Sequence, residues 1–187
     1  MKTFKTLAVA AAAWLALGAT PAAHAALVLP AGTVITGSAS GASDRLLGLD
    51  AGFADEAGSH ITRLAAADLE YLTADFAVAV DFFSDGRVQV YNNTDTPLLP
   101  GNYSLTFDFA GLAQPITGFM ALDASGVTLT VLGDQRVNLS FSNLDFGSPF
   151  GSFNAQITTG TVPEPASLAL VGAGLGLLAL RRTRRPA

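Results

Sequence analysis

A strict alternation of apolar and polar residues constrains the fold of this chain most. Between Tyr103 and Phe109 the sequence runs Tyr-Ser-Leu-Thr-Phe-Asp-Phe, the two-residue period of a β-strand with one buried and one wet face. The period recurs, with turn-forming residues such as Ser84-Asp85-Gly86 in between, in the segments 76–83, 87–91, 116–122, 127–132, 137–141 and 153–157. Strands joined by short turns pair as antiparallel hairpins. The sequence therefore predicts an all-β fold, an antiparallel β-sandwich or jelly-roll-like single domain of roughly six or seven strands.

Two stretches before residue 74 lack this regular period. Residues 27–59 are rich in Gly, Ala, Ser and Asp, and we expect an early strand around Val34 followed by a loop. In residues 59–72, the apolar residues Ile61, Leu64 and Leu72 share one helical face only if Asp68 lies at the margin of that face. This spacing favours a short helix or a turn there.

The N-terminus has the three parts of a secretory signal peptide. Lys2 and Lys5 precede an apolar run from Leu7 to Ala19, and small residues follow at Ala23 and Ala25. This order predicts that residues 1–25 direct export through the Sec translocon and that signal peptidase cleaves after Ala25. The segment 26–161 is then the exported domain.

The exported segment is strongly acidic and has no cysteine. Together with the first residues of the tail, from residue 26 to residue 165, it carries four arginines and fifteen carboxylates, a net charge of −11. This charge argues against nucleic acid as a partner and repels acidic polymers unless cations intervene. Without disulfides, the domain must be held together by its hydrophobic core.

The C-terminal residues 162–187 form three parts in a fixed order. The motif at 162–167 contains Pro163, Glu164 and Pro165, and the two prolines keep this peptide extended. The run 166–180 has no charge; as a transmembrane helix it would be roughly 22 Å long, against a hydrocarbon core of about 30 Å. Four arginines come after this run: Arg181, Arg182, Arg184 and Arg185. They should stop translocation of the chain and remain in the cytoplasm.

This order of motif, helix and arginines resembles the PEP-CTERM sorting signal of exopolysaccharide-producing Gram-negative bacteria. The triplet Pro163-Glu164-Pro165 matches the residues for which that signal is named, and the terminal arginines match its basic cluster. The resemblance implies processing by exosortase, a membrane protease. It further implies a protein that is transiently anchored in the inner membrane and then released to the cell surface or the extracellular space.

Little in the exported segment points to catalysis. His60 is its one histidine, so a histidine-based zinc site or a histidine general base has few partners. The neighbouring carboxylates Asp55–Glu56 and Asp68–Glu70 would suit a glycosidase, although neighbours of this kind are expected in so acidic a segment. The exported segment has no tryptophan, which argues against polysaccharide binding. Only Tyr71, Tyr91 and Tyr103 could form an aromatic face there, because we expect most of the phenylalanines to be buried.

The acidic loops offer oxygen ligands of the kind that Ca²⁺ takes. The residues that would bind it weakly are Asp50, Asp55, Glu56, Asp81 and Asp85. The sequence thus predicts a non-enzymatic surface or matrix protein, associated with exopolysaccharide and biofilm, that needs no cofactor other than this Ca²⁺. The alternatives are a Ca²⁺-assisted polysaccharide-binding module and, more distantly, a hydrolase.

Overall fold

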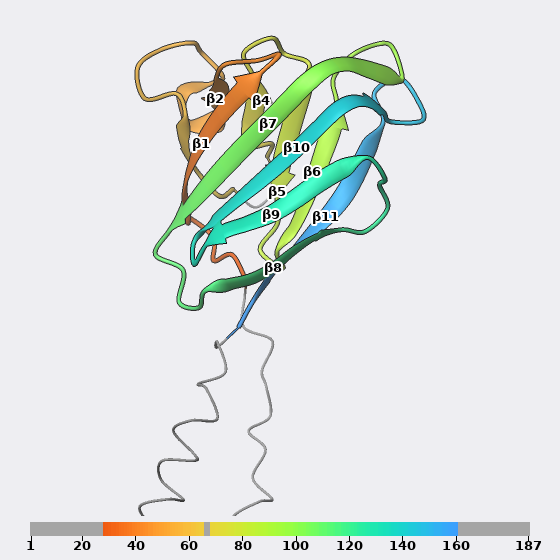
Figure 1. The fold of residues 1–187 in the computed structure, drawn as a ribbon. Coiled ribbons are helices and arrows are strands. Elements are labelled where there is room, and N and C mark those ends of the chain that lie inside the picture. The colour runs from red at the N-terminus through yellow and green to blue at the C-terminus, as the bar shows by residue number, and fades with distance from the viewer. Residues whose placement is uncertain (1–27, 66–67, 161–187) are drawn as a thin grey trace, which may run out of the picture.

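The structure, a computed structural model, describes residues 28–65 and 68–160 (Figure 1). This part of the chain is a two-layered all-β fold with one short 3₁₀ turn, η1 (Leu49–Ala51), and no α-helix. The strands are β1 (Val34–Gly41), β2 (Leu46–Gly48), β3 (Ile61–Arg63), β4 (Tyr71–Thr73), β5 (Val78–Phe82), β6 (Arg87–Asn92), β7 (Leu98–Ala110), β8 (Ile116–Ala121), β9 (Val127–Gly133), β10 (Arg136–Asp145) and β11 (Ser152–Thr159).

All strand pairs are antiparallel, and they form two sheets. The five-stranded sheet has the order β3-β1-β7-β10-β9, and the six-stranded sheet has the order β2-β4-β5-β6-β11-β8. The two sheets lie face to face (Figure 1). This arrangement confirms the predicted all-β, sandwich-like domain.

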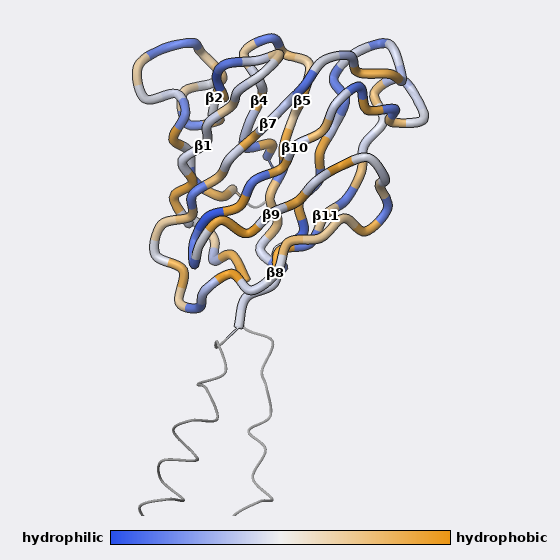
Figure 2. The backbone as a smooth tube through the Cα atoms, in the orientation of Figure 1, coloured by the Kyte–Doolittle hydropathy of each residue, from blue (hydrophilic) through white to orange (hydrophobic). Residues whose placement is uncertain are grey.

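The hydrophobic core lies between the sheets, where the alternating strands meet. On β7, Leu105, Phe107 and Phe109 are at most 1% exposed, and the residues between them are half-buried. On β10 the same alternation buries Val137, Leu139 and Phe141. Hydrophobic and hydrophilic residues follow one another along these strands (Figure 2). Removing these side chains from water is the main source of stability in a chain without disulfides.

The prediction of a helix or turn in residues 59–72 is wrong. Short strands occupy its two ends, because β3 pairs with β1 and β4 pairs with β2 and β5. Tyr71 is fully buried, and its hydroxyl donates a hydrogen bond to the Ile35 carbonyl oxygen at 2.6 Å. Cross-strand pairing and this burial override a helical spacing that only a few apolar residues supported.

Two smaller boundaries also differ from the sequence prediction. The strand expected from Phe76 begins at Val78, and Phe76 lies in the preceding turn, 53% exposed. Strand β7 begins at Leu98, before the alternating run that starts at Tyr103. The described residues also hold eleven strands, more than predicted, because β2, β3 and β4 have three residues each, too few to show a period.

The two ends of the described domain lie at the same end of the sandwich. Gly86, with φ +86°, lies close to residues near both ends: a Cβ there would lie 2.5 Å from the Ile157 carbonyl oxygen and 2.7 Å from Val28 Cγ1. The Ile157 amide donates to the Gly86 carbonyl oxygen at 2.8 Å. The chain therefore enters near Val28 and leaves after Gly160 close to one hairpin turn.

The predicted signal peptide (1–25) and transmembrane helix (166–180) lie outside the described residues. Within residues 28–65 and 68–160, no helix has the length and apolar character that crossing a membrane requires.

Candidate functional site

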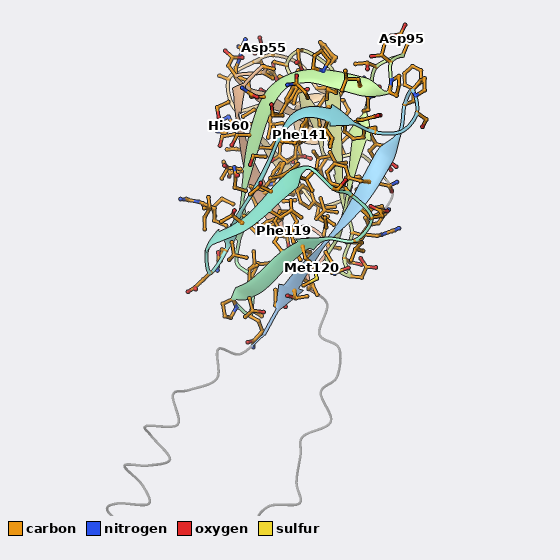
Figure 3. All side chains as sticks on the ribbon, turned by 45° about the vertical axis from the view of Figure 1, so that its right-hand side comes forward. Asp55, His60, Asp95, Phe119, Met120 and Phe141 are labelled. Atoms are coloured by element: carbon orange, nitrogen blue, oxygen red, sulfur yellow. The ribbon has the colours of Figure 1, made fainter. Side chains whose placement is uncertain are left out.

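Three of the residues singled out in the sequence meet at one cleft. Asp55, Glu56 and His60 line a cavity of about 660 Å³ between the 52–60 loop and the strands β1 and β2. Figure 3 shows Asp55 and His60 on the same side of the domain. The cleft is at the edge of the sandwich, where the loop after η1 folds back over β1.

Hydrogen bonds of the backbone hold the 52–60 loop in place. The Gly48 amide donates to the Ser59 carbonyl oxygen at 2.6 Å, and the Gly37 amide donates to the His60 carbonyl oxygen at 2.8 Å. Gly48 also approaches Ser59 so closely that a Cβ would lie 2.7 Å from its carbonyl oxygen. Glycine at position 48 is therefore needed to bring the loop against the strands.

The acidic side chains of this region are partly neutralised by arginines. Arg45 Nη1 lies 2.7 Å from Asp55 Oδ1, and Arg63 Nη1 lies 2.9 Å from Asp50 Oδ2. All four side chains are at least 40% exposed, so each pair contributes about 0–1 kcal/mol to stability. The rim of the cleft thus carries positively and negatively charged side chains. It can donate hydrogen bonds to a hydroxylated ligand and accept them from it.

The remaining calcium candidates lie elsewhere. Asp85 caps the β5–β6 turn, where its carboxylate accepts a hydrogen bond from the Arg87 amide at 3.0 Å. Asp81 faces Glu70 on the six-stranded sheet. The structure therefore does not bring the five predicted calcium ligands together, and in residues 28–65 and 68–160 no three His, Cys, Asp or Glu side chains gather as a metal site would require.

The surroundings of Glu70 are not visible in the sequence. Glu70 is fully buried, and its carboxyl oxygens accept hydrogen bonds from the Ala65 amide at 2.9 Å and the Phe82 amide at 2.7 Å. Burial raises the pKa of Glu70, the two amide hydrogen bonds lower it, and the nearby Asp81 carboxylate raises it, so that the resulting pKa is about 8. Glu70 therefore favours its protonated form at neutral pH, and its carboxyl group joins Ala65 to β5. No spacing in the sequence connects Glu70, which precedes β4, with Asp81 on β5.

The three tyrosines do not form a common face. The Tyr71 side chain is buried in the core, and Tyr103 is 4% exposed, with its hydroxyl donating to Asp75 Oδ2 at 2.7 Å. Tyr91 is half-buried on β6. Burial raises the pKa of all three hydroxyls, so each remains protonated in the physiological range.

The residues predicted to direct sorting follow the last strand. Strand β11 ends at Thr159, and the Gly160 amide donates to the Pro115 carbonyl oxygen at 3.1 Å. The family model for the PEP-CTERM protein-sorting motif matches residues 161–185. The chain carries a PEP-CTERM sorting motif. The match confirms the resemblance of the tail and indicates an exosortase-targeted, secreted protein with a cell-surface or extracellular destination.

The PEP-CTERM motif begins directly after the domain, at residue 161. Its residues Pro163, Glu164 and Pro165 lie outside the described residues, as do the four terminal arginines and the signal-peptide residues Ala23 and Ala25. No curated protein and no solved structure shows significant similarity to the chain.

Proposed function

We propose that the chain is an exported, exosortase-processed protein of the cell surface or extracellular matrix, associated with exopolysaccharide and without enzymatic activity. The observation that carries this proposal is the PEP-CTERM motif at residues 161–185. The precursor enters the Sec translocon, loses residues 1–25 to signal peptidase, and is held by the apolar run 166–180 until exosortase cuts within or close to 162–167.

The fold supports a cut at this position. Strand β11 lies between β6 and β8 in the interior of its sheet, and it ends at Thr159. Every buried residue of the described core therefore precedes the motif, the last of them being Ile157. Removal of the tail takes no side chain from this described core, so we expect the released product to keep its fold.

The Ca²⁺-assisted polysaccharide-binding module remains the second candidate. One observation favours it: Asp55 and Glu56 share the rim of a cleft that also holds Arg45 and His60. Carboxylate oxygens at a polar cleft are the groups through which Ca²⁺ and sugar hydroxyls are bound. Turnover of a glycan panel would favour the more distant hydrolase alternative.

Intact-mass measurement on membrane, surface and medium fractions tests the sorting proposal. We expect a mature protein that begins near Ala26, ends within or close to 162–167, and is recovered outside the inner membrane. Glu164→Ala should leave the precursor uncut, because the recognition charge is lost. A second variant replaces four arginines with serine, at Arg181, Arg182, Arg184 and Arg185. It should misroute the precursor, because the signal that stops translocation is lost.

Glu56→Ala is the matched control, since it removes an exposed carboxylate far from the motif in sequence. Its processing should equal that of the wild type. A wild-type product that still contains residues 166–187 would make the tail a permanent anchor and the proposal wrong.

A further inference from the structure

Two phenylalanines of the domain combine a strained backbone with exposure to water. Phe76 has φ +58° and is 53% exposed, and Phe150 has φ +53° and is 64% exposed. The left-handed region costs a residue with a Cβ roughly 1–2 kcal/mol. Neither side chain recovers that cost by burial in the core.

Both residues occupy turn positions that normally take glycine. The Phe76 amide donates to the Thr73 carbonyl oxygen at 2.8 Å and closes the turn between β4 and β5, where the left-handed residue of such a hairpin is usually glycine. The Gly151 amide donates to the Ser148 carbonyl oxygen at 3.0 Å, which places Pro149 and Phe150 in the two central positions. With a positive φ in the second of them, this turn calls for glycine or asparagine.

The two phenylalanines lie on either side of a third turn, which follows β6 between β5 and β11. Asn93 Nδ2 donates to the Phe76 carbonyl oxygen at 2.8 Å, and the Phe150 amide donates to the Thr94 carbonyl oxygen at 3.0 Å. Asn92 makes this turn rigid, because its side chain accepts from the Thr94 hydroxyl at 2.7 Å and donates to the Thr96 carbonyl oxygen at 2.6 Å. We name Phe76 and Phe150, the two exposed phenylalanines that contact this turn, the aromatic platform.

The aromatic platform lies at the end of the sandwich away from the sorting motif. Strand β11 runs from the Phe150 turn to Thr159, and its eight residues span about 26 Å. Asp95, next to the platform turn, projects at the opposite end from Met120 on β8 (Figure 3). The platform therefore lies far from the point where the domain joins its tail.

The size and charge of the platform decide which partner it fits. Phenylalanine side chains have about 150–250 Å² each, so the exposed fractions leave roughly 230 Å² in all, well below the ~800 Å² that one partner contributes to a stable protein interface. Asp75 directly precedes Phe76, and Asp95 directly follows Thr94, whose carbonyl oxygen the Phe150 amide contacts. These carboxylates repel anionic headgroups and anionic polymers. A ring of neutral sugar fits both features, because its C–H face packs on an aromatic ring while its hydroxyls donate to carboxylates.

We infer that the aromatic platform of Phe76 and Phe150 binds a neutral polysaccharide chain by stacking of its sugar rings. This inference rests on the proposed association with exopolysaccharide and assigns that association to a surface. The strain of both turns is then the cost of placing aromatic rings where glycine would fold more easily, which is the pattern expected of a binding site.

Affinity electrophoresis of the full chain in gels with a neutral β-glucan, a galactomannan or a polyuronate tests the inference. We expect at least one neutral polymer to retard the wild type and the polyuronate to leave it unretarded. Phe76→Gly and Phe150→Gly should each weaken the binding at least tenfold. Their melting temperatures should equal or exceed that of the wild type, because glycine relieves the left-handed strain. Phe76→Asn, which also tolerates this φ, should behave as Phe76→Gly does.

Met120→Ser is the matched control, because Met120 is 54% exposed and lies on β8, away from the platform. Its binding should be unchanged. Equal binding by the wild type and both glycine variants would overturn the platform and leave the proposed association intact. Binding of no neutral polymer, or a wild-type dimer that the glycine variants lose, would also overturn it. Failure to bind the exopolysaccharide purified from the producing cells would instead refute the association itself.

Discussion

Phe82 on β5 packs edge-on against Phe107 on β7, with ring centroids 4.9 Å apart and an interplanar angle of 76°. Phe82 makes a second edge contact with Phe109 at 5.3 Å. Because β5 and β7 belong to different sheets, these three rings join the two layers of the sandwich. Aromatic pairs of this geometry contribute about 0.5–1.5 kcal/mol beyond the area that they bury.

Charge at the centre of this cluster should unfold the domain. Phe107 is 1% exposed, so Phe107→Asp places an unpaired carboxylate in the core and should cost several kcal/mol. Thr106→Asp, one residue earlier on the wet face of the same strand, should cost less than about 1 kcal/mol. Urea denaturation measures both. Equal costs would mean that the two faces of β7 are assigned wrongly.

The domain should fold without its two terminal segments. A fragment of residues 26–160 contains the whole described core, and we expect a soluble monomer with the far-ultraviolet circular dichroism of strands. Its cooperative melting, compared with that of the secreted protein, checks this expectation. A mainly helical spectrum or a non-cooperative melt would contradict it.

Stability should fall as the pH rises from about 4.5 to about 8 because of Glu70. In the unfolded chain this carboxyl releases its proton near its ordinary pKa of 4.5, whereas burial holds the folded-state pKa at about 8. The folded state therefore binds more protons across this window, and it loses stability on the order of a few kcal/mol as the pH rises through it. Unfolding free energies measured by denaturant from pH 5 to pH 9 give the slope.

Glu70→Gln separates this titration from a general effect of pH. Glutamine cannot titrate, and it loses one of the two amide hydrogen bonds that the carboxyl accepts. The variant should be less stable than the wild type at pH 5, yet its stability should change little up to pH 9. An equally steep slope in the variant would show that another group carries the pH dependence.

Millimolar Ca²⁺ should raise the melting temperature if the acidic loops bind it as the sequence predicts. At one hundred times its dissociation constant, a ligand stabilises the folded state by about 2.7 kcal/mol. Arg45→Gln frees Asp55 from its 2.7 Å ion pair and should enlarge the shift. NaCl at equal ionic strength controls for screening of the negative charge. No shift with Ca²⁺ in either protein would remove the support for a calcium-assisted module.

The sequence predicts those parts of the fold in which one strand carries enough residues to show a period. Strands β7 and β10 are thirteen and ten residues long, and their alternation identifies both the strand and its buried face. Strands β2, β3 and β4 have three residues each, and only pairing with distant partners makes them strands. Local spacing cannot reveal such pairs.

The candidate sites follow the same distinction: sites made of contiguous residues can be found in the sequence, and sites made of distant residues cannot. The sorting motif is contiguous and carries its meaning in sequence order, so a family model finds it at residues 161–185. The contacts of Glu70 with Phe82 and of Phe150 with Thr94 join residues that are 12 and 56 positions apart. The left-handed backbone of Phe76 is also invisible in sequence, because the residue type at that turn position argues for a strand.

Val28 and Ile157 both lie next to Gly86, so the domain could be inserted into another protein without separating its two ends. A host protein can carry it as an insert between two adjacent residues of a surface loop, because both ends leave from the same pole and no strand has to stretch to reach them. For the same reason, a short linker from Gly160 to Val28 would allow new termini to be opened in the exposed 54–58 loop. A protein or membrane anchor joined at the end of the sandwich where both termini lie would leave the opposite end exposed to solvent.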